Sequence, residues 1–406
     1  MKEIIQFKTA KRFLIVRMLA KMAHCCYFCI FPIFLYKRGF SVFDISVLET
    51  VFSLGIVCFE IPTGLIADRI RRDKCIHLSY VLLLVSYVMI FLNQSYGILV
   101  AANILMAISA SFSSGIIDVW LIDGLESDGF DGGMAIISSF MQMVDNLGST
   151  IGLILGGILA VLAIQFAFSG GLILIILAVV FCFILVKDNT KQNTENVMQN
   201  EPIKTYLVNS AKAVTLPFLC VSISMAFVSF AIASPLNDHW QVQFNLKGIT
   251  NEFLLSNIYS IRTILIIVGG LIVGKISRRE QGHNLGIFRI FISCSAIALI
   301  VSAVSTNCWI SLIGWAVISV TNTIARSFWT AELIGTMDAS RKSTLFSVNS
   351  LIFSLASALG SLTIGKIAEI KSISYGWVIC GIIMIVAVLF SFIATAQVRR
   401  NSNKSR

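Results

Sequence analysis

Charged residues and proline are scarce in this sequence. Charged side chains make up 13% of the 406 residues and hydrophobic side chains 57%, whereas a soluble domain usually carries about 25% charged residues. So few charges cannot cover the water-facing surface of a chain this long, which excludes an ordinary soluble enzyme. The 5 prolines exclude a proline-rich disordered protein. Most of the chain is therefore expected to lie in lipid.

Signatures of several other classes are also missing. The nucleotide-binding pattern G-x-x-x-x-G-K-[ST] does not occur, which argues against ATP-driven transport. No Ser/His/Asp or metal-ligand cluster stands out, so we expect neither an enzyme nor a bound metal or cofactor. The net charge of +10 comes without a polar basic segment interleaved with aromatics, so nucleic acid is not an expected partner.

The 10 cysteines are scattered, nearly all within apolar runs, which is typical of buried free thiols. Cys26 and Cys29 form a C-x-x-C pair beside His24. A metal or redox site there stays open as an alternative to plain packing of small side chains in a membrane helix.

Apolar runs predict twelve membrane-spanning helices, since about 20 apolar residues cross a bilayer as a helix. The first run follows Lys8, Lys11 and Arg12 and is too long for a signal peptide. The first six helices are expected at about 13–36, 46–68, 76–93, 96–122, 135–161 and 163–186, and the second six at about 212–237, 251–275, 284–304, 308–333, 342–366 and 374–397.

The predicted fold is an all-α membrane protein with two six-helix, pseudo-symmetric halves. Residues 1–186 form the N-terminal bundle, 187–211 a polar cytoplasmic linker rich in Asn, Thr and Gln, and 212–406 the C-terminal bundle. If both termini are cytoplasmic, most Lys and Arg residues between the spans fall in cytoplasmic segments, as is usual for membrane proteins. We expect a monomer in the cytoplasmic membrane of a bacterium, in contact with the lipid bilayer.

The two halves look like repeats of each other. Gly64–Arg72 (GLIADRIRR) follows the second predicted helix, and Gly270–Arg278 (GLIVGKISR) follows the eighth. Trp120 and Asp123 near the end of the fourth helix match Trp329 and Glu332 in the tenth at equal spacing. Such parallel halves place a substrate path between them.

The segment Gly64–Arg72 resembles the loop signature of the major facilitator superfamily, G-x-x-x-D-R-x-x-R, at Gly64, Asp68, Arg69 and Arg72. The stretches around Glu60-Ile61-Pro62-Thr63 and Trp120 are similar to the superfamily's drug:proton antiporter branch. The resemblance implies alternating access, with Asp68 locking one gating state against a neighbouring helix. A solvated basic loop that only fixes topology is the alternative. The sequence departs from the branch in having no mid-membrane Arg in the fourth helix.

Ionisable residues within the spans are costly in lipid and therefore indicate function. Lys21 and Glu60 each lie about 12 Å deep from the cytoplasmic edge, and Arg17 and Asp118 each about 6 Å. Equal depth predicts the pairs Lys21–Glu60 and Arg17–Asp118. Alternatively, the cations extend to the lipid headgroups.

Asp145 and Arg262 both lie near the predicted midplane, about 15 Å from the ends of their helices. The resemblance implies that these two helices face each other across the halves. Protonation of Asp145 would then weaken an Asp145–Arg262 pair and couple a proton to rocking. A static pair that holds the halves together is the alternative.

A polar and aromatic substrate cavity is predicted from the first and tenth helices, although plain packing is the more common reason for an aromatic stripe. The cavity residues are His24, Tyr27, Phe28, Phe31, Asn322, Arg326 and Trp329.

The sequence thus favours a proton-coupled exporter of amphipathic drugs or toxic metabolites. The alternatives are a nutrient or organic-anion symporter or facilitator, and a sensor or assembly subunit that does not transport.

Overall fold

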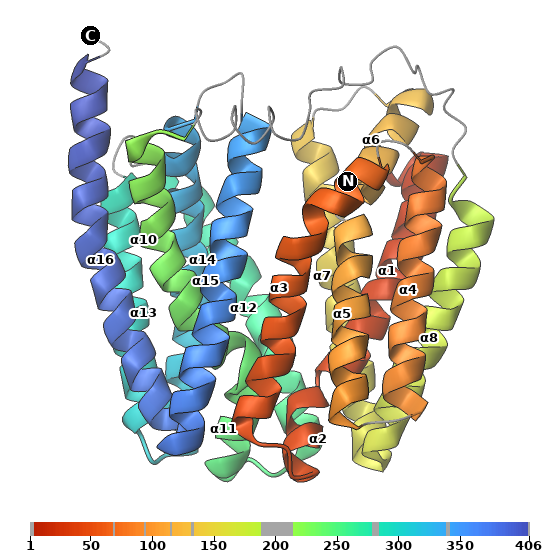
Figure 1. The fold of residues 1–406 in the computed structure, drawn as a ribbon, viewed down its shortest axis with the longest axis horizontal. Helices are drawn as coiled ribbons and strands as arrows, with labels where there is room; N and C mark the ends of the chain where they lie inside the picture. The colour runs from red at the N-terminus through yellow and green to blue at the C-terminus, as the bar shows by residue number, and fades with distance from the viewer. Residues whose placement is uncertain are drawn as a thin grey trace. The chain divides into compact units, whose positions relative to one another are not determined.

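The computed structural model describes residues 4–67, 70–92, 95–113, 116–130, 134–187, 214–277, 284–337 and 342–404. Within these ranges the regular structure is entirely helical (Figure 1). Twelve of the described helical segments are long and apolar enough to cross a membrane. The predicted all-α membrane fold is confirmed.

The chain divides into two compact units. Unit 1 comprises Met1–Lys37, Val51–Val197 and Thr250–Ser260, and unit 2 comprises Arg38–Thr50, Met198–Ile249 and Ile261–Arg406. Apart from Lys187, the predicted linker 187–211 lies outside the described residues.

Most of the first half of the chain belongs to unit 1. A short 3-10 turn at Ile4–Gln6 precedes α1 (Lys8–Phe28) and α2 (Phe31–Lys37). Then follow α3 (Val42–Ala67), α4 (Arg72–Leu92), α5 (Tyr96–Ser113), α6 (Ile116–Ser127), α7 (Met134–Leu162) and α8 (Ile164–Leu185). Helix α1 packs against α7 and α8, and α4 packs against α5 and α8.

Unit 2 repeats this arrangement. Its elements are α10 (Leu216–Ile232), a π-helical turn η3 (Ala233–Asp238), α11 (Trp240–Leu246), α12 (Glu252–Ser277), α13 (Asn284–Val304), α14 (Cys308–Gly335), α15 (Lys342–Ile370) and α16 (Ile373–Lys404). Helix α10 packs against α15 and α16, and α13 packs against α14 and α16. The helix order of the contacts is that of unit 1, as a duplicated chain requires.

Glycines bring α7 of unit 1 against α1. Gly148, Gly152 and Gly156 recur every fourth residue and therefore lie on one face of α7. A Cβ at Gly148 would lie 2.9 Å from the Met18 carbonyl oxygen, and one at Gly152 or Gly156 would collide with the backbone of α1. Small residues at this spacing let membrane helices approach backbone to backbone. The side chains that flank this stripe are consequently held against α1.

Two predicted helices begin or end at residues other than those expected, and local capping explains one of the differences. Ser41 and Asp44 cap each other's backbone N–H groups at 2.8 and 3.0 Å, which starts α3 at Val42 rather than near 46. The predicted first helix, 13–36, starts earlier at Lys8 and is interrupted between Phe28 and Phe31.

The seventh span contains the η3 turn because Pro235 lacks a backbone N–H and interrupts the regular pattern. Instead, the His239 N–H donates to the Ser234 carbonyl at 3.0 Å. Side chains satisfy two carbonyls of this turn: Trp315 Nε1 donates to Pro235 at 2.7 Å, and Arg262 Nη1 donates to Leu236 at 3.1 Å. The helix then continues beyond the predicted end at 237, as far as Leu246.

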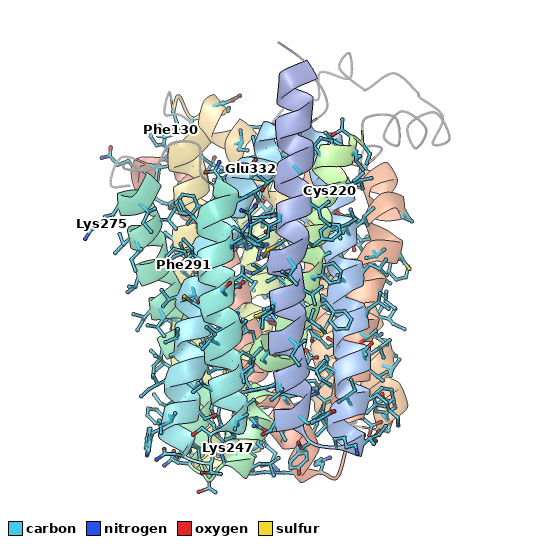
Figure 2. The ribbon with its side chains drawn as sticks, turned by 90° about the vertical axis from the view of Figure 1, so that its left-hand side faces the viewer. Phe130, Cys220, Lys247, Lys275, Phe291 and Glu332 are labelled. Carbon is cyan, nitrogen blue, oxygen red and sulfur yellow. The ribbon has the colours of Figure 1, made fainter. Side chains whose placement is uncertain are left out.

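Lys247 lies at the end of unit 2 opposite to Lys275 and Glu332 (Figure 2). Its ammonium donates to the carbonyls of Ser302 (2.6 Å), Ala303 (3.2 Å) and Ser305 (2.8 Å) and to the Ser311 hydroxyl (2.9 Å). It thereby caps the C-terminus of α13, where a positive charge is favoured. Burial lowers the pKa of Lys247.

Candidate functional site

A cluster of charges lies on the contact between α1 and α7 in unit 1. Arg17 binds Asp145 in a bidentate pair, with Nε 2.7 Å from Oδ1 and Nη2 3.0 Å from Oδ2. Lys21, one helical turn further along α1, places Nζ 3.6 Å from the same Oδ2. Because Asp145 precedes Gly148 by one turn, the close approach of the helices presents it to both cations.

The cluster is half-buried, so solvent or a mobile ion can reach it. The side chains of Arg17, Lys21 and Asp145 are 23%, 35% and 31% exposed. Asp118 on α6 and Tyr80 on α4 interact electrostatically with Arg17. Two cations and two acids thus meet where α1, α6 and α7 come together.

Neither predicted charge pair forms a direct ion pair among the described residues, although Asp118 lies within electrostatic reach of Arg17. The sequence predicts that Arg17 pairs with Asp118 and Lys21 with Glu60, but both cations bind Asp145. Among the described residues Glu60 makes no ion pair with Lys21. Depth along the membrane gives only one coordinate, and the glycine face of α7 decides which acid faces α1.

Arg262 belongs to unit 2 and donates through Nη1 to the Leu236 carbonyl. An Asp145–Arg262 pair would join the two units, and it stays a prediction.

The predicted gating motif is only partly described. Asp68 and Arg69 lie outside the described residues, and Gly64 lies within α3. Arg72, the first residue of α4, forms an ion pair with Asp123 on α6. This contact was not predicted, although the equal spacing of Trp120–Asp123 and Trp329–Glu332 was an available signal.

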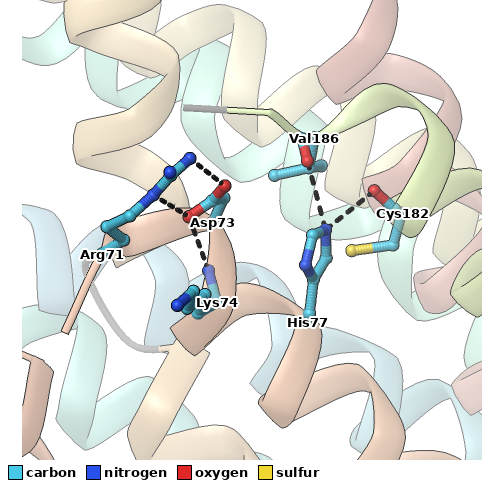
Figure 3. A network of polar contacts seen from close by, with 6 residues as sticks. All are labelled: Arg71, Asp73, Lys74, His77, Cys182 and Val186. Carbon is cyan, nitrogen blue, oxygen red and sulfur yellow. Dashed lines mark hydrogen bonds and ion pairs between the residues drawn. The ribbon is translucent and has the colours of Figure 1, made fainter. Parts of the chain in front are cut away.

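Beside this motif, polar contacts tie the start of α4 to the end of α8 (Figure 3). Arg71 Nη2 and Asp73 Oδ2 lie 2.7 Å apart, and the backbone N–H of Lys74 donates to Asp73. His77 Nε2 contacts the carbonyls of Cys182 and Val186 at 3.2 and 3.1 Å. Those carbonyls terminate α8, so His77 caps it.

The predicted aromatic residues of the first helix are mostly packed inside unit 1. The ring of Tyr27 lies 4.6 Å from Phe31, 5.3 Å from Tyr87 and 5.6 Å from Phe168. Both Tyr27 and Phe31 are buried. They belong to the core, contrary to their predicted place in the cavity.

His24 and Phe28 lie elsewhere on the same helix. The His24 ring stacks on Phe28 at 5.6 Å, and Phe28 meets the edge of Tyr259 at 5.9 Å.

Unit 2 contains a cavity of about 350 Å³ between η3, α12 and α14. It is lined by Leu236, Arg262, Ile266, Ser319, Asn322, Thr323, Arg326, Ser327 and Thr330. Asn322 and Arg326, two of the predicted cavity residues, thus line one cavity.

Trp329 does not line this cavity. Its side chain is 2% exposed, Nε1 donates to the Val221 carbonyl at 2.7 Å, and its ring lies 5.0 Å from Phe353. It packs α14 against α10 and α15. The prediction placed it in the cavity because it shares a helix with Arg326, but it lies on another face.

A buried polar network around η3 was not predicted. His239 contacts the Ser234 and Ser46 hydroxyls, each at 2.8 Å, and the Val42 carbonyl at 3.1 Å. Asp238 is 3% exposed and lies beside the Ser361 hydroxyl. The polar run S-P-L-N-D-H at the end of an apolar span was the available signal.

Two repeated helical units with twelve candidate membrane spans, a charged helix contact in one unit and a polar cavity in the other are the arrangement of a membrane transporter. The sequence profile of the Major Facilitator Superfamily matches residues 13–331. The chain belongs to this superfamily of secondary transporters, and it is a multi-pass membrane protein.

Individual relatives are distant. The quinolone resistance protein NorA of Staphylococcus aureus (strain MRSA252) is 22% identical over 232 residues, which cover 54% of this chain and 56% of that protein. The match therefore spans about half the length of this curated relative. The uncharacterized MFS-type transporter YxaM of Bacillus subtilis (strain 168) is 20% identical over 89% of both chains.

Solved structures share the fold. The nucleoside transporter NupG superposes with a TM-score of 0.76 at 12% identity, covering 95% of this chain and 99% of that chain. An inward-facing bacterial homolog of the human lysosomal transporter Spinster superposes with a TM-score of 0.69 at 15% identity, covering 96% of each.

Proposed function

We propose that this protein is a proton-coupled exporter of amphipathic drugs or toxic metabolites, located in the cytoplasmic membrane of a bacterium with both termini inside. The observation that carries the proposal is the Arg17–Asp145–Lys21 cluster, a titratable acid held by two cations between two membrane helices. The partial similarity to a quinolone resistance protein supports the direction of transport.

The geometry suggests how a proton is coupled to a conformational change. The bidentate contact with Arg17 requires an ionised Asp145. Protonation removes the negative charge, and Arg17 and Lys21 then lose their common partner. The contact of α1 with α7 weakens, which favours a different arrangement of the helices. Release of the proton on the other side of the membrane restores the pair.

Transport in reconstituted vesicles tests this role. Asp145→Asn keeps the shape of the side chain but cannot titrate, so proton-driven accumulation of a fluorescent amphipathic substrate is expected to disappear. Glu369→Gln is the matched control, because Glu369 pairs only with Lys366 near the end of α15 among the described contacts. Undiminished uphill transport by Asp145→Asn would remove Asp145 from the coupling mechanism.

One observation favours a second candidate function, the symport or facilitated uptake of an organic anion. Two arginines line the cavity of unit 2, and their positive charges would attract an organic anion whether the protein imports or exports it. Vesicle transport in both directions, with the proton gradient imposed from either side, separates import from export. A protein that binds ligand but moves none in either direction would instead be a sensor or assembly subunit.

A further inference from the structure

The charged side chains described in the lining of the unit 2 cavity are both cations, Arg262 and Arg326. No carboxylate is among the described lining residues. Arg326 is exposed to this space and makes no ion pair or side-chain hydrogen bond within the described part of the chain. It lies about 14 Å from the end of α14, near the middle of a hydrocarbon layer of about 30 Å. A cation at this depth is costly unless an anion or water approaches it.

The described hydroxyl groups of the lining cannot donate a hydrogen bond to an anion. Each lies on α14 and donates its hydrogen to a carbonyl one turn earlier: Ser319 to Trp315, Thr323 to Ser319, Ser327 to Thr323, and Thr330 to Arg326. Their oxygens can therefore accept hydrogen bonds from a ligand but have no hydrogen left to donate. The remaining side-chain donors that face the cavity are the guanidinium groups and the Asn322 amide.

Asn322 adds an independent sign of a ligand. Its Oδ1 is shielded from solvent and has no hydrogen-bond partner among the described residues. A buried amide oxygen without a donor costs stability unless a bound molecule supplies one. Asn322 is one turn from Arg326, so both lie on the same face of α14 and line the same cavity.

Two described acids lie two residues from the lining in sequence, and neither belongs to it. Asp238 follows Leu236 but is buried in the η3 network. Glu332 follows Thr330 on α14 and accepts a hydrogen bond from Asn284 at 3.2 Å.

We infer that this cavity binds the carboxylate of an amphipathic organic acid, with Arg326 as the principal anion-binding residue, Arg262 as a second positive charge, and Asn322 and the α14 hydroxyl oxygens as acceptors for the ligand's N–H or O–H groups. This assignment names a substrate class for the transporter and rests on the proposed function for the direction of movement. Planar guanidinium groups suit carboxylates because they donate two parallel hydrogen bonds.

Binding of matched ligand pairs tests the assignment. The full-length protein in lipid nanodiscs is titrated with norfloxacin and its methyl ester, and with 2-naphthoate and 2-naphthamide. Each pair keeps the aromatic body and differs in the anionic group. We expect the acids to bind about tenfold more tightly than their neutralised partners, as charge-assisted hydrogen bonds require.

Variants then assign the preference to a residue. Arg326→Gln is expected to remove the acid preference while binding of the methyl ester and the amide stays within about twofold. Arg326→Lys keeps the charge and retains part of the preference. Lys366→Gln is the matched control in unit 2, since it removes one positive charge outside the cavity. Melting temperatures of all variants show that folding is intact, and if Arg326→Gln misfolds, Arg326→Lys and Asn322→Ala carry the comparison.

Two outcomes overturn the inference: no acid preference in either pair with the parent protein, or an undiminished preference in Arg326→Gln. Failure of the exporter proposal can be told apart from failure of the anion site. If the acids bind through Arg326 but a proton gradient drives neither acid, the anion site stands and the exporter proposal fails. If export proceeds with an acid preference independent of Arg326, the exporter proposal stands and this site fails.

Discussion

The cations within the predicted spans have acidic partners in unit 1, whereas Arg326 in unit 2 has none among the described residues. In unit 1, Arg17 and Lys21 share Asp145, and Asp118 lies within electrostatic reach. In unit 2, Arg326 faces a cavity in whose described lining there is no acid. The same helix arrangement thus supports a charge cluster that is balanced internally in one unit and, in the other, a cation at Arg326 that no described group balances. An internally balanced cluster stabilises a helix contact and responds to protons, whereas unbalanced charge is available for a ligand.

The close approach of α1 and α7 underlies the balanced cluster, and breaking it has the largest expected effect. Gly152→Ala places a Cβ against the backbone of Met22, where neither side can yield without moving a helix. We expect a loss of about 3 kcal/mol in the free energy of unfolding, the upper part of the range for overpacking. Gly270→Ala is the control, since its Cβ would meet no atom within 4 Å. Thermal unfolding in detergent measures both, and equal melting temperatures would contradict the packing argument.

The second largest effect is expected from replacing Arg17 or Asp145, the two residues of the bidentate ion pair. Asp145→Asn leaves Arg17 and Lys21 without a negatively charged partner, and Arg17→Gln leaves Asp145 with an uncharged and therefore weaker donor. Each single change is expected to lower the free energy of unfolding by about 1–3 kcal/mol. This is less than for a fully buried pair, because solvent reaches these groups. The double variant is expected to lose less than the sum, with an interaction of at least about 0.5 kcal/mol. Additive losses would mean that the pair does not contribute in the membrane.

The contrast between the units predicts opposite responses to losing a cation. Arg326→Gln removes a charge that no described group balances, so the free energy of unfolding should stay within about 0.5 kcal/mol or rise. Arg17→Gln should lower it, as above. Unfolding of the two variants without added ligand makes the comparison. A loss from Arg326→Gln as large as that from Arg17→Gln would show that Arg326 has a structural partner.

The smallest stability effect is expected at the loop end of unit 1. Arg72 and Asp123 are each about one-third exposed, with side-chain values of 36% and 35%. Exposed ion pairs contribute about 0.2–1 kcal/mol. Arg72→Gln and Asp123→Asn should therefore fold normally, and any effect should fall on turnover rather than on substrate affinity, because the motif resembles a gating element. Vesicle transport rates measured at several substrate concentrations separate the two, and a change confined to affinity would contradict a gating role.

The fold followed from the sequence because lipid allows little choice. Apolar runs of spanning length must become helices, and repeated segments such as Gly64–Arg72 and Gly270–Arg278 indicated two halves. The element boundaries were less predictable. The early start of α3 depends on reciprocal capping by Ser41 and Asp44, and the extension of the seventh span depends on side chains from α12 and α14.

The site was predicted only in part, because helix register gives depth but not rotation about the helix axis. Arg17, Lys21 and Asp145 were all singled out, yet with the wrong partners. The glycines of α7 that decide the pairing form a contact surface that spacing alone does not assign to a partner helix. Trp329 was misplaced for the same reason, since its partner Val221 lies on a helix more than 100 residues earlier. Asp238 was missed because its burial depends on the turn that Pro235 imposes.

The cap that Lys247 provides to α13 has a consequence for how unit 2 opens. One side chain from the end of α11 holds the last carbonyls of α13 and a hydroxyl at the start of α14. Detachment of the turn after α11 would leave those carbonyls without the Lys247 donor, so we expect the three helix ends to open together. Backbone amides after Lys247 and those around Ser305 should accordingly exchange with deuterium at matched rates, as members of one cooperative unfolding unit.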